Sequence, residues 1–209
     1  MKKSILIILS LFLGFSCGLQ KQANYGLLND ECILSNFNET SVKELENLIL
    51  FLDNKLLEKT NTKDLGMIYK SFSRELVETS SVSNQKTINL ISQNELEELI
   101  SKLSDDTFSE VWYYEYGYDY LTKDTLSVFL NINMTGKYFK CLLQFSENNN
   151  ELKEYINIVL EDGFVGPSLN ATFPFFAQTL DFLYPMNRLF FAVHFYSLIY
   201  EKDFKSEIE

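Results

Sequence analysis

The chain has 209 residues, of which 46% are hydrophobic and 15% aromatic, a composition with enough apolar surface to form a folded core. It carries 18 Lys and Arg residues against 29 Asp and Glu residues, a formal net charge of −11. Because no Lys/Arg cluster follows the first three residues, this charge would repel a phosphate backbone, and we expect no binding of nucleic acid.

The first sixteen residues have the layout of a secretory signal peptide. Two lysines precede twelve uncharged, mostly apolar residues (4–15), fewer than the roughly 20 that a bilayer-crossing helix needs. Cys17 follows after one small residue, and the segment resembles the lipobox of bacterial lipoproteins, with Gly14 in place of the usual leucine. The resemblance implies cleavage before Cys17 and acylation of that residue. The alternative is an ordinary secretory signal that leaves Cys17 as an unmodified thiol.

The same resemblance implies a place in the bacterial cell envelope. Residues 18–22 contain neither an acidic run nor an Asp next to the cysteine. We therefore expect an outer-membrane lipoprotein that faces the periplasm and contacts the membrane through acyl chains on Cys17. The mature chain would have 16 basic and 29 acidic residues, a net charge of −13, which would steer basic proteins toward it.

The mature chain divides into a lipid-anchored tether, residues 17–38, and a single domain, residues 39–209. Residues 23–38 are assigned to the tether because they lack a sustained apolar period. Cys32 and Cys141 are an even pair in an oxidising compartment, where they can form a disulfide; the alternative is two buried thiols. One histidine and two distant cysteines cannot form a metal site of the His-rich or Cys-rich kind, and we expect no cofactor.

Helical spacing marks the first part of the domain. Ser41 and Glu44 have the form of a capping box before an apolar stripe, and a second stripe over 65–76 predicts an antiparallel partner helix. Residues 79–85 predict a loop, and 87–91 a short strand. Ser92 and Glu95 predict a second capping box and a third helix, which ends at 105–106.

From residue 108 the apolar period changes from 3.6 to 2, which is typical of strands. The pattern predicts an antiparallel meander that includes strands at 126–134 and 138–145, joined by a turn at Thr135 and Gly136. Residues 151–160 fit either a helix or a strand, and we assign them to a strand. Residues 163–170 are expected to form a loop.

Residues 173–200 are rich in Phe and Tyr. Charged residues and Pro185 interrupt this segment, so it predicts two helices packed on the sheet rather than a membrane span. The expected fold class is α+β, with N-terminal helices, an antiparallel meander of three to four strands and two aromatic-rich C-terminal helices. This order is weakly similar to the NTF2-like fold, which would imply a small-ligand carrier or a non-catalytic binding module.

The sequence contains few groups suited to catalysis. His194 is the single imidazole and stands among apolar residues, so we interpret it as a buried histidine and not as a general base. The sequence contains no glycine-rich phosphate loop. A carboxylate pair of the glycosidase kind stays open as an alternative, because spacing in sequence does not fix spacing in space.

A run of aromatic residues is the strongest candidate for ligand or partner contact. Alternation along a strand puts every second residue of 112–120 on one face. This face either covers the C-terminal helices or contacts a ligand or partner through amphipathic rings. Its members are Trp112, Tyr114, Tyr116, Tyr118 and Tyr120.

These features favour a non-catalytic, lipid-anchored periplasmic protein that binds a macromolecular partner, such as an inhibitor or immunity protein of a basic enzyme. The alternative is a carrier of an apolar small molecule, a lipid or a quinone, suggested by the aromatic C-terminal segment. A carboxylate-dependent enzyme that acts on glycans is a third hypothesis.

Overall fold

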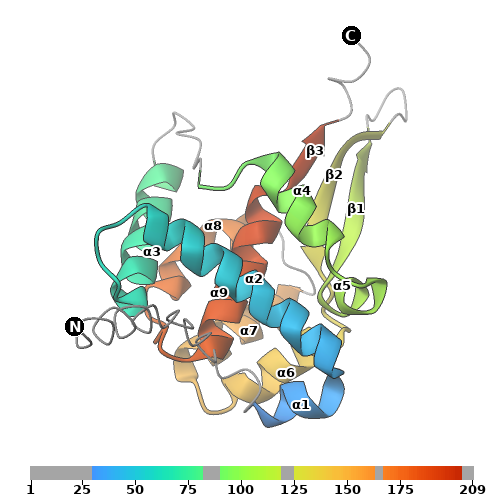
Figure 1. Cartoon of the computed structure of the whole chain (residues 1–209), viewed down its shortest axis with the longest axis horizontal. Coiled ribbons are helices and arrows are strands. Elements are labelled where there is room, and N and C mark those ends of the chain that lie inside the picture. The colour runs from blue at the N-terminus through green and yellow to red at the C-terminus, as the bar shows by residue number, and fades with distance from the viewer. Residues whose placement is uncertain (1–29, 82–89, 119–124, 163–166, 204–209) are drawn as a thin grey trace, which may run out of the picture.

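Helix α9 (Pro185–Ile199) lies at the centre of the molecule, with other helices packed around it (Figure 1). The computed structural model describes residues 30–81, 90–118, 125–162 and 167–203. All eleven residues from Met186 to Tyr196 are buried, as expected of a helix that is apolar on every side. Among the helices described, none is long and apolar enough to cross a membrane.

The three predicted N-terminal helices are confirmed, but several of their ends differ. Residues 79–81, predicted as loop, complete the second helix. The third helix ends at Ser101, and residues 105–106, its predicted end, begin a further helix that extends to Val111, so the strand period predicted from residue 108 starts only after it. The apolar stripe of α2 is buried from Leu45 to Leu56. The N-cap is Asn38, whose Oδ1 accepts the backbone N–H of Ser41 at 2.9 Å. The capping box predicted at Ser41 and Glu44 is therefore wrong, since Ser41 is buried inside the first turn. The helices of this half are α1 (Glu31–Asn36), α2 (Glu39–Glu58), α3 (Leu65–Ser81), α4 (Gln93–Ser101) and α5 (Asp105–Val111).

The capping box predicted for α4 is confirmed. Ser92 Oγ accepts the backbone N–H of Glu95, and the Glu95 carboxylate accepts the backbone N–H of Ser92 at 2.9 Å. The short strand predicted at 87–91 falls mostly outside the described residues, and residues 90–91 lie in a turn.

The sheet is smaller than the predicted meander. Strands β1 (Trp112–Tyr118) and β2 (Thr125–Ile132) form an antiparallel hairpin in which Trp112 lies opposite Ile132. The three-residue β3 (Glu201–Asp203) pairs with the other edge of β2 and gives the order β1-β2-β3. The hairpin projects from the helical body (Figure 1). An α+β fold results, in which helices predominate.

Two segments predicted as strands are helices. Residues 138–145 lie in α6 (Lys137–Ser146), and residues 151–160 lie in α7 (Asn150–Asp162). The assignment of 151–160 was wrong because its apolar residues recur at the i, i+3, i+4, i+7 spacing of a helix. These four residues are all buried: Leu152, Tyr155, Ile156 and Val159.

A contact distant in sequence fixes the start of α6. The Glu110 carboxylate accepts the backbone N–H of Lys137 at 2.7 Å and so satisfies a free donor of the first helical turn. Gly136 lies so close to α5 that an added Cβ would be 2.2 Å from the backbone oxygen of Glu110. The expected turn at Thr135 and Gly136 is thus the entry to a helix that packs on α5.

The two aromatic C-terminal helices are confirmed, on either side of the break before Pro185. They are α8 (Pro167–Ala177) and α9, which has Pro185 in its first turn, where a missing N–H costs no hydrogen bond. Residues 167–170, expected as loop, are the first turn of α8. The pair contacts α2, α3, α6 and α7 as well as β2, so it packs mainly among helices instead of on the sheet.

A buried ion pair links the central helix to the N-terminal helices. Arg188 of α9 donates to Asp53 of α2 at 2.8 Å, and the hydroxyl of Tyr69 on α3 donates to the same carboxylate at 2.8 Å. Asp53 is only 1% exposed. Three helices therefore meet at one polar cluster, which fixes their relative register.

Helix α1 occupies part of the predicted tether. Asp30 caps it by accepting the backbone N–H of Ile33 at 3.0 Å, and both Cys32 and Ile33 are buried. Cys32 forms a disulfide with Cys141 of α6, with a Cα–Cα distance of 5.4 Å. The folded residues therefore begin with α1, within the range that the sequence assigned to the tether. The signal peptide and Cys17 lie outside the described residues.

Candidate functional site

The predicted aromatic row divides between the core and the surface. Trp112 is fully buried, and its Nε1 donates to Ser197 Oγ of α9 at 3.0 Å. Tyr114, Tyr116 and Tyr118 are 37%, 50% and 60% exposed, in that order along the projecting hairpin. Tyr120 lies outside the described residues. The row therefore begins in the core and becomes a surface feature.

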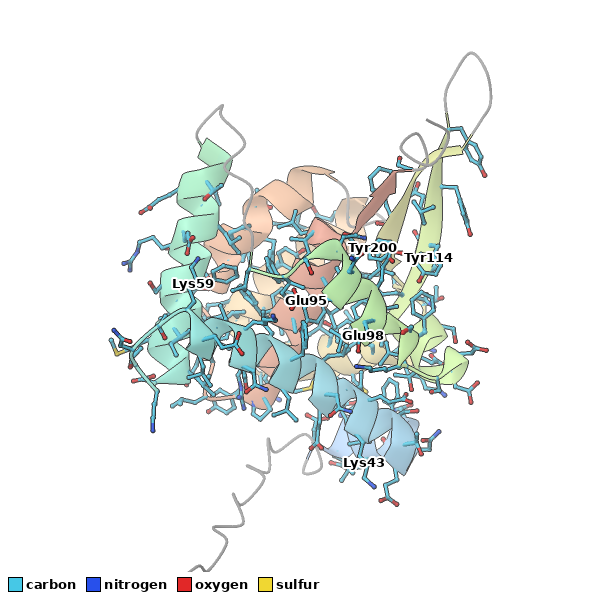
Figure 2. All side chains as sticks on the ribbon, turned by 45° about the horizontal axis from the view of Figure 1, so that its top comes forward. Lys43, Lys59, Glu95, Glu98, Tyr114 and Tyr200 are labelled. Atoms are coloured by element: carbon cyan, nitrogen blue, oxygen red, sulfur yellow. A yellow bond between two sulfur atoms is a disulfide. The ribbon has the colours of Figure 1, made fainter. Side chains whose placement is uncertain are left out.

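The inner part of this surface is an ordered aromatic cluster. The Tyr114 ring lies 4.9 Å from the Phe108 ring and 5.9 Å from the Tyr200 ring, and Figure 2 shows Tyr114 and Tyr200 next to one another. Burial raises the pKa of Tyr200 above its usual value, and the neighbouring Tyr114 and Glu97 raise it further. The charge of Glu97, on α4, thus acts on Tyr200, the ring that lies beside Tyr114 of the hairpin.

The opposite face of the hairpin also carries exposed aromatic rings, which the sequence analysis did not single out. Tyr113 is 47% exposed and Phe129 is 36% exposed. An added Cβ at Gly117 would lie 3.2 Å from the Phe129 ring and 2.7 Å from Ser127 Oγ, so the glycine leaves room for that ring. We call the five exposed rings on the two faces of the hairpin, taken together, the hairpin aromatic surface: Tyr113, Tyr114, Tyr116, Tyr118 and Phe129.

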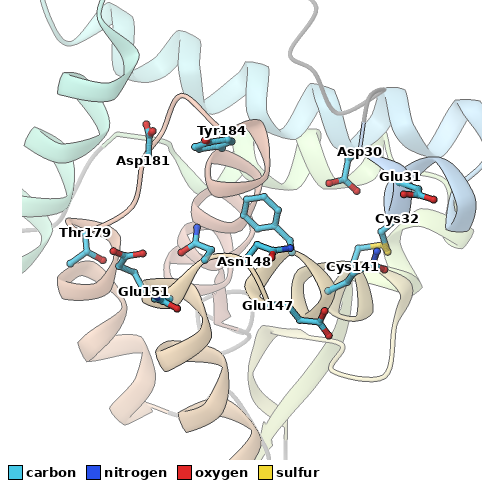
Figure 3. Close-up of a pocket in the computed structure, with 14 residues that line it drawn as sticks. Asp30, Glu31, Cys32, Cys141, Glu147, Asn148, Glu151, Thr179, Asp181 and Tyr184 are labelled. Carbon is cyan, nitrogen blue, oxygen red and sulfur yellow. A yellow bond between two sulfur atoms is a disulfide. The ribbon is translucent and has the colours of Figure 1, made fainter.

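A polar groove lies on another part of the molecule, where α1, α6 and α7 face the turn between α8 and α9 (Figure 3). Its volume is about 670 Å³. Five carboxylates line it, and the fourteen lining residues include no Lys, Arg or His. None of the five forms an ion pair with a described residue. We call it the acidic groove and define it by these carboxylates: Asp30, Glu31, Glu147, Glu151 and Asp181.

Backbone hydrogen bonds and packing hold the walls of the groove. The Asp181 carboxylate accepts the backbone N–H of Leu183 at 3.0 Å, and the buried Asn187 side chain donates to the Asp181 backbone oxygen at 2.8 Å. The exposed Tyr184 ring and the Phe145 ring, 6.5 Å apart, add an aromatic side to the groove. Carboxylates next to aromatic faces suit a cationic group, which both attract.

The disulfide is part of the same wall. Cys32 and Cys141 both line the groove, and their bond joins α1, which carries Asp30 and Glu31, to α6. The bridge closes a loop with a sequence separation of 109 residues, and a link of that length stabilises a fold by about 4–5 kcal/mol in the chain-entropy account. It therefore fixes the position of two of the five carboxylates.

His194 is a core residue. It is 1% exposed and lies against the rings of Phe190, Phe173 and Tyr155. Its Nδ1–H donates to the Phe190 backbone oxygen at 2.9 Å, and burial lowers the pKa of His194 to about 3. The described residues contain no group of three His, Cys, Asp or Glu side chains placed to hold a metal ion.

The comparisons with known proteins give no relative. No family model matches the sequence, and no curated protein or solved structure is significantly similar to it. The two surfaces are therefore the features from which a function can be inferred. The sequence indicated the aromatic one through alternation, but it gave no signal for the groove beyond net charge, because the five carboxylates come from segments up to 151 positions apart.

Proposed function

We propose that this chain is a non-catalytic, lipid-anchored periplasmic protein that binds a basic protein partner at the acidic groove. The observation that carries the proposal is the groove itself: five carboxylates around about 670 Å³ with no cationic side chain among the lining residues. A Lys or Arg side chain of a partner would supply the missing countercharge. The place in the envelope is supported by the signal-like first sixteen residues and Cys17.

The acidic groove is better suited to binding a partner than to catalysing a reaction. Aligned charge on one concave surface speeds association with an oppositely charged partner and disfavours acidic ones. The remaining lining residues are amides, Thr179 and two aromatic residues beside the disulfide, which can donate to or pack against a bound chain. The carrier hypothesis has less support, because most of the aromatic C-terminal residues that suggested it pack into the core, and only Phe175 and Tyr184 among them are exposed in the described part of the chain.

A charge-matched pair of variants tests this function. The groove variant carries Glu31→Gln, Glu147→Gln and Glu151→Gln. The control variant carries the same number of neutralised carboxylates on α2, α3 and α4, which contribute no residue to the lining of the groove. Its substitutions are Glu58→Gln, Glu78→Gln and Glu98→Gln.

The probe is an amidated hexalysine peptide, titrated against the whole chain by fluorescence anisotropy. The groove variant should bind it about tenfold more weakly than the control variant, although both have the same net charge. Binding by wild type should weaken as salt is raised from about 0.01 M to about 1 M, because the Debye length falls from about 30 Å to about 3 Å. Equal affinities for the two variants would refute a role for the groove.

A further inference from the structure

Strand β1 has a free edge with respect to the described residues. Among them, the order β1-β2-β3 gives it a hydrogen-bonding partner on one side only, and Figure 1 shows it as the outermost strand of the projecting hairpin. Apart from β2, the described element that packs most against β1 is α5, which precedes it directly in the chain. In the described part of the chain, no helix is placed along this edge.

The register tells which backbone groups point outward. Val111 accepts the backbone N–H of Asn133 at 2.9 Å, and hydrogen-bonded residues alternate along an antiparallel strand. Residues 113 and 115 therefore turn their N–H and C=O toward β2, whereas Tyr114 and Tyr116 turn theirs to the free edge. The two outward residues repeat at the spacing that an added strand requires.

The free edge has only part of the usual protection. Edge strands are commonly blocked by Lys, Pro, an inward-pointing charge or a β-bulge. Strand β1 reads WYYEYGY and contains neither Lys nor Pro, and its one irregularity lies between Gly117 and Tyr118, beyond the outward groups of Tyr114 and Tyr116. Its exposed rings, Tyr113 on one face and Tyr114 and Tyr116 on the other, would flank the side chains of an added strand and bury apolar area against them.

Charge indicates what kind of strand fits. Glu115 is the one charged residue of β1 and is exposed, and Glu97 of α4 lies close to the neighbouring Tyr200. A second copy of this chain would bring its own excess of carboxylates to the interface, which like-charge repulsion disfavours. We infer that the free edge of β1 accepts an extended, Lys- or Arg-bearing segment of a protein partner as a fourth strand. This surface is separate from the acidic groove, and its test does not require that the groove bind anything.

The test uses the whole chain and an acetylated, amidated octapeptide of alternating Lys and Val. Hydrogen exchange read residue by residue by NMR should show slower exchange at the Tyr114 and Tyr116 amides when the peptide is added, by about tenfold or more. The amides of Tyr113 and Glu115 should change little, since β2 already binds them. The groove variant should show the same protection, which separates this inference from the function of the groove.

Two substitutions at one position supply the control. Tyr116→Pro removes an outward N–H without touching the β1–β2 ladder, whereas Tyr116→Ala removes the same ring and keeps the N–H. Proline should abolish the protection at Tyr114, and alanine should only reduce it. If the proline variant does not fold, the wild-type exchange at Tyr114 and Tyr116 decides.

Three results would overturn the inference. The first is that the peptide binds without slowing hydrogen exchange at the Tyr114 and Tyr116 amides. That result would mean that charge attraction alone holds the peptide and that no strand is added. The second is no binding at millimolar peptide. The third is a concentration-dependent dimer in sedimentation velocity that Tyr116→Pro dissociates, which would make a second copy the occupant.

Discussion

Replacing His194 with leucine should change how stability depends on pH. Burial lowers the pKa of this histidine from 6.5 to about 3, so the native state keeps it neutral where the unfolded chain takes up a proton. The contribution of the neutral histidine to the free energy of unfolding is therefore fully present above pH 6.5 and is lost as the pH falls toward 3. At about 1.4 kcal/mol for each pH unit, the whole loss is about 5 kcal/mol.

The assay is urea unfolding of the whole chain and of His194→Leu between pH 7 and pH 4. The difference in the free energy of unfolding, wild type minus variant, should fall by about 1.4 kcal/mol for each pH unit below pH 6. Carboxylates common to both proteins cancel in this difference. Tyr155→Phe is the matched control, because it changes a ring that packs against His194 without removing a group that titrates in this range, so its difference from wild type should stay constant. A difference for His194→Leu that is also constant from pH 6 to pH 4 would refute the assignment of a buried, neutral imidazole.

Other substitutions test the packing. Arg188→Met should lower the free energy of unfolding by about 3–5 kcal/mol in chemical denaturation, because it leaves the buried Asp53 carboxyl without its countercharge; a loss below 1 kcal/mol, about that of an exposed pair, would contradict the burial of this ion pair. Cys141→Ser should cost about 2–5 kcal/mol and lower the thermal midpoint to that of the reduced wild type, and an unchanged midpoint would count against the bridge. Gly136→Ala should destabilise by about 1–3 kcal/mol, since its Cβ would meet a backbone oxygen of α5 at 2.2 Å. Gly66→Ala, whose nearest neighbour would be a side-chain oxygen at 3.3 Å, should be close to neutral, so equal losses for the two alanine variants would contradict the close approach.

The parts of the fold that the sequence predicted are those in which one local pattern decides the structure. The stripe of α2 from Leu45 to Leu56 has an unbroken helical period, and Ser92 with Glu95 is a complete capping signal. Pro185 stands in the first turn of α9, where its missing N–H costs no hydrogen bond. It separated the two C-terminal helices correctly, although Pro174 is accommodated inside α8. Each of these predictions depends on residues that lie within a few positions of each other in the sequence.

One error, the strand assigned to residues 151–160, overlooked a local helical spacing of apolar residues. The other errors arise where distant contacts decide the structure. Residues 138–145 have strand-like side chains, yet Glu110 caps them as a helix from 27 positions away. Residues 31–36 are too short a segment to show a period, and a disulfide with Cys141 holds them in the fold. The acidic groove was not predicted for the same reason, because its carboxylates meet only in the tertiary structure.

The most direct test of the proposed function is capture from detergent-solubilised cell envelopes by wild type, the groove variant and the control variant. We expect wild type and the control variant to retain the same basic protein at low salt and to release it at high salt, and we expect the groove variant not to retain it. Retention of one partner equally by all three proteins, or retention that is unchanged at high salt, would contradict the account.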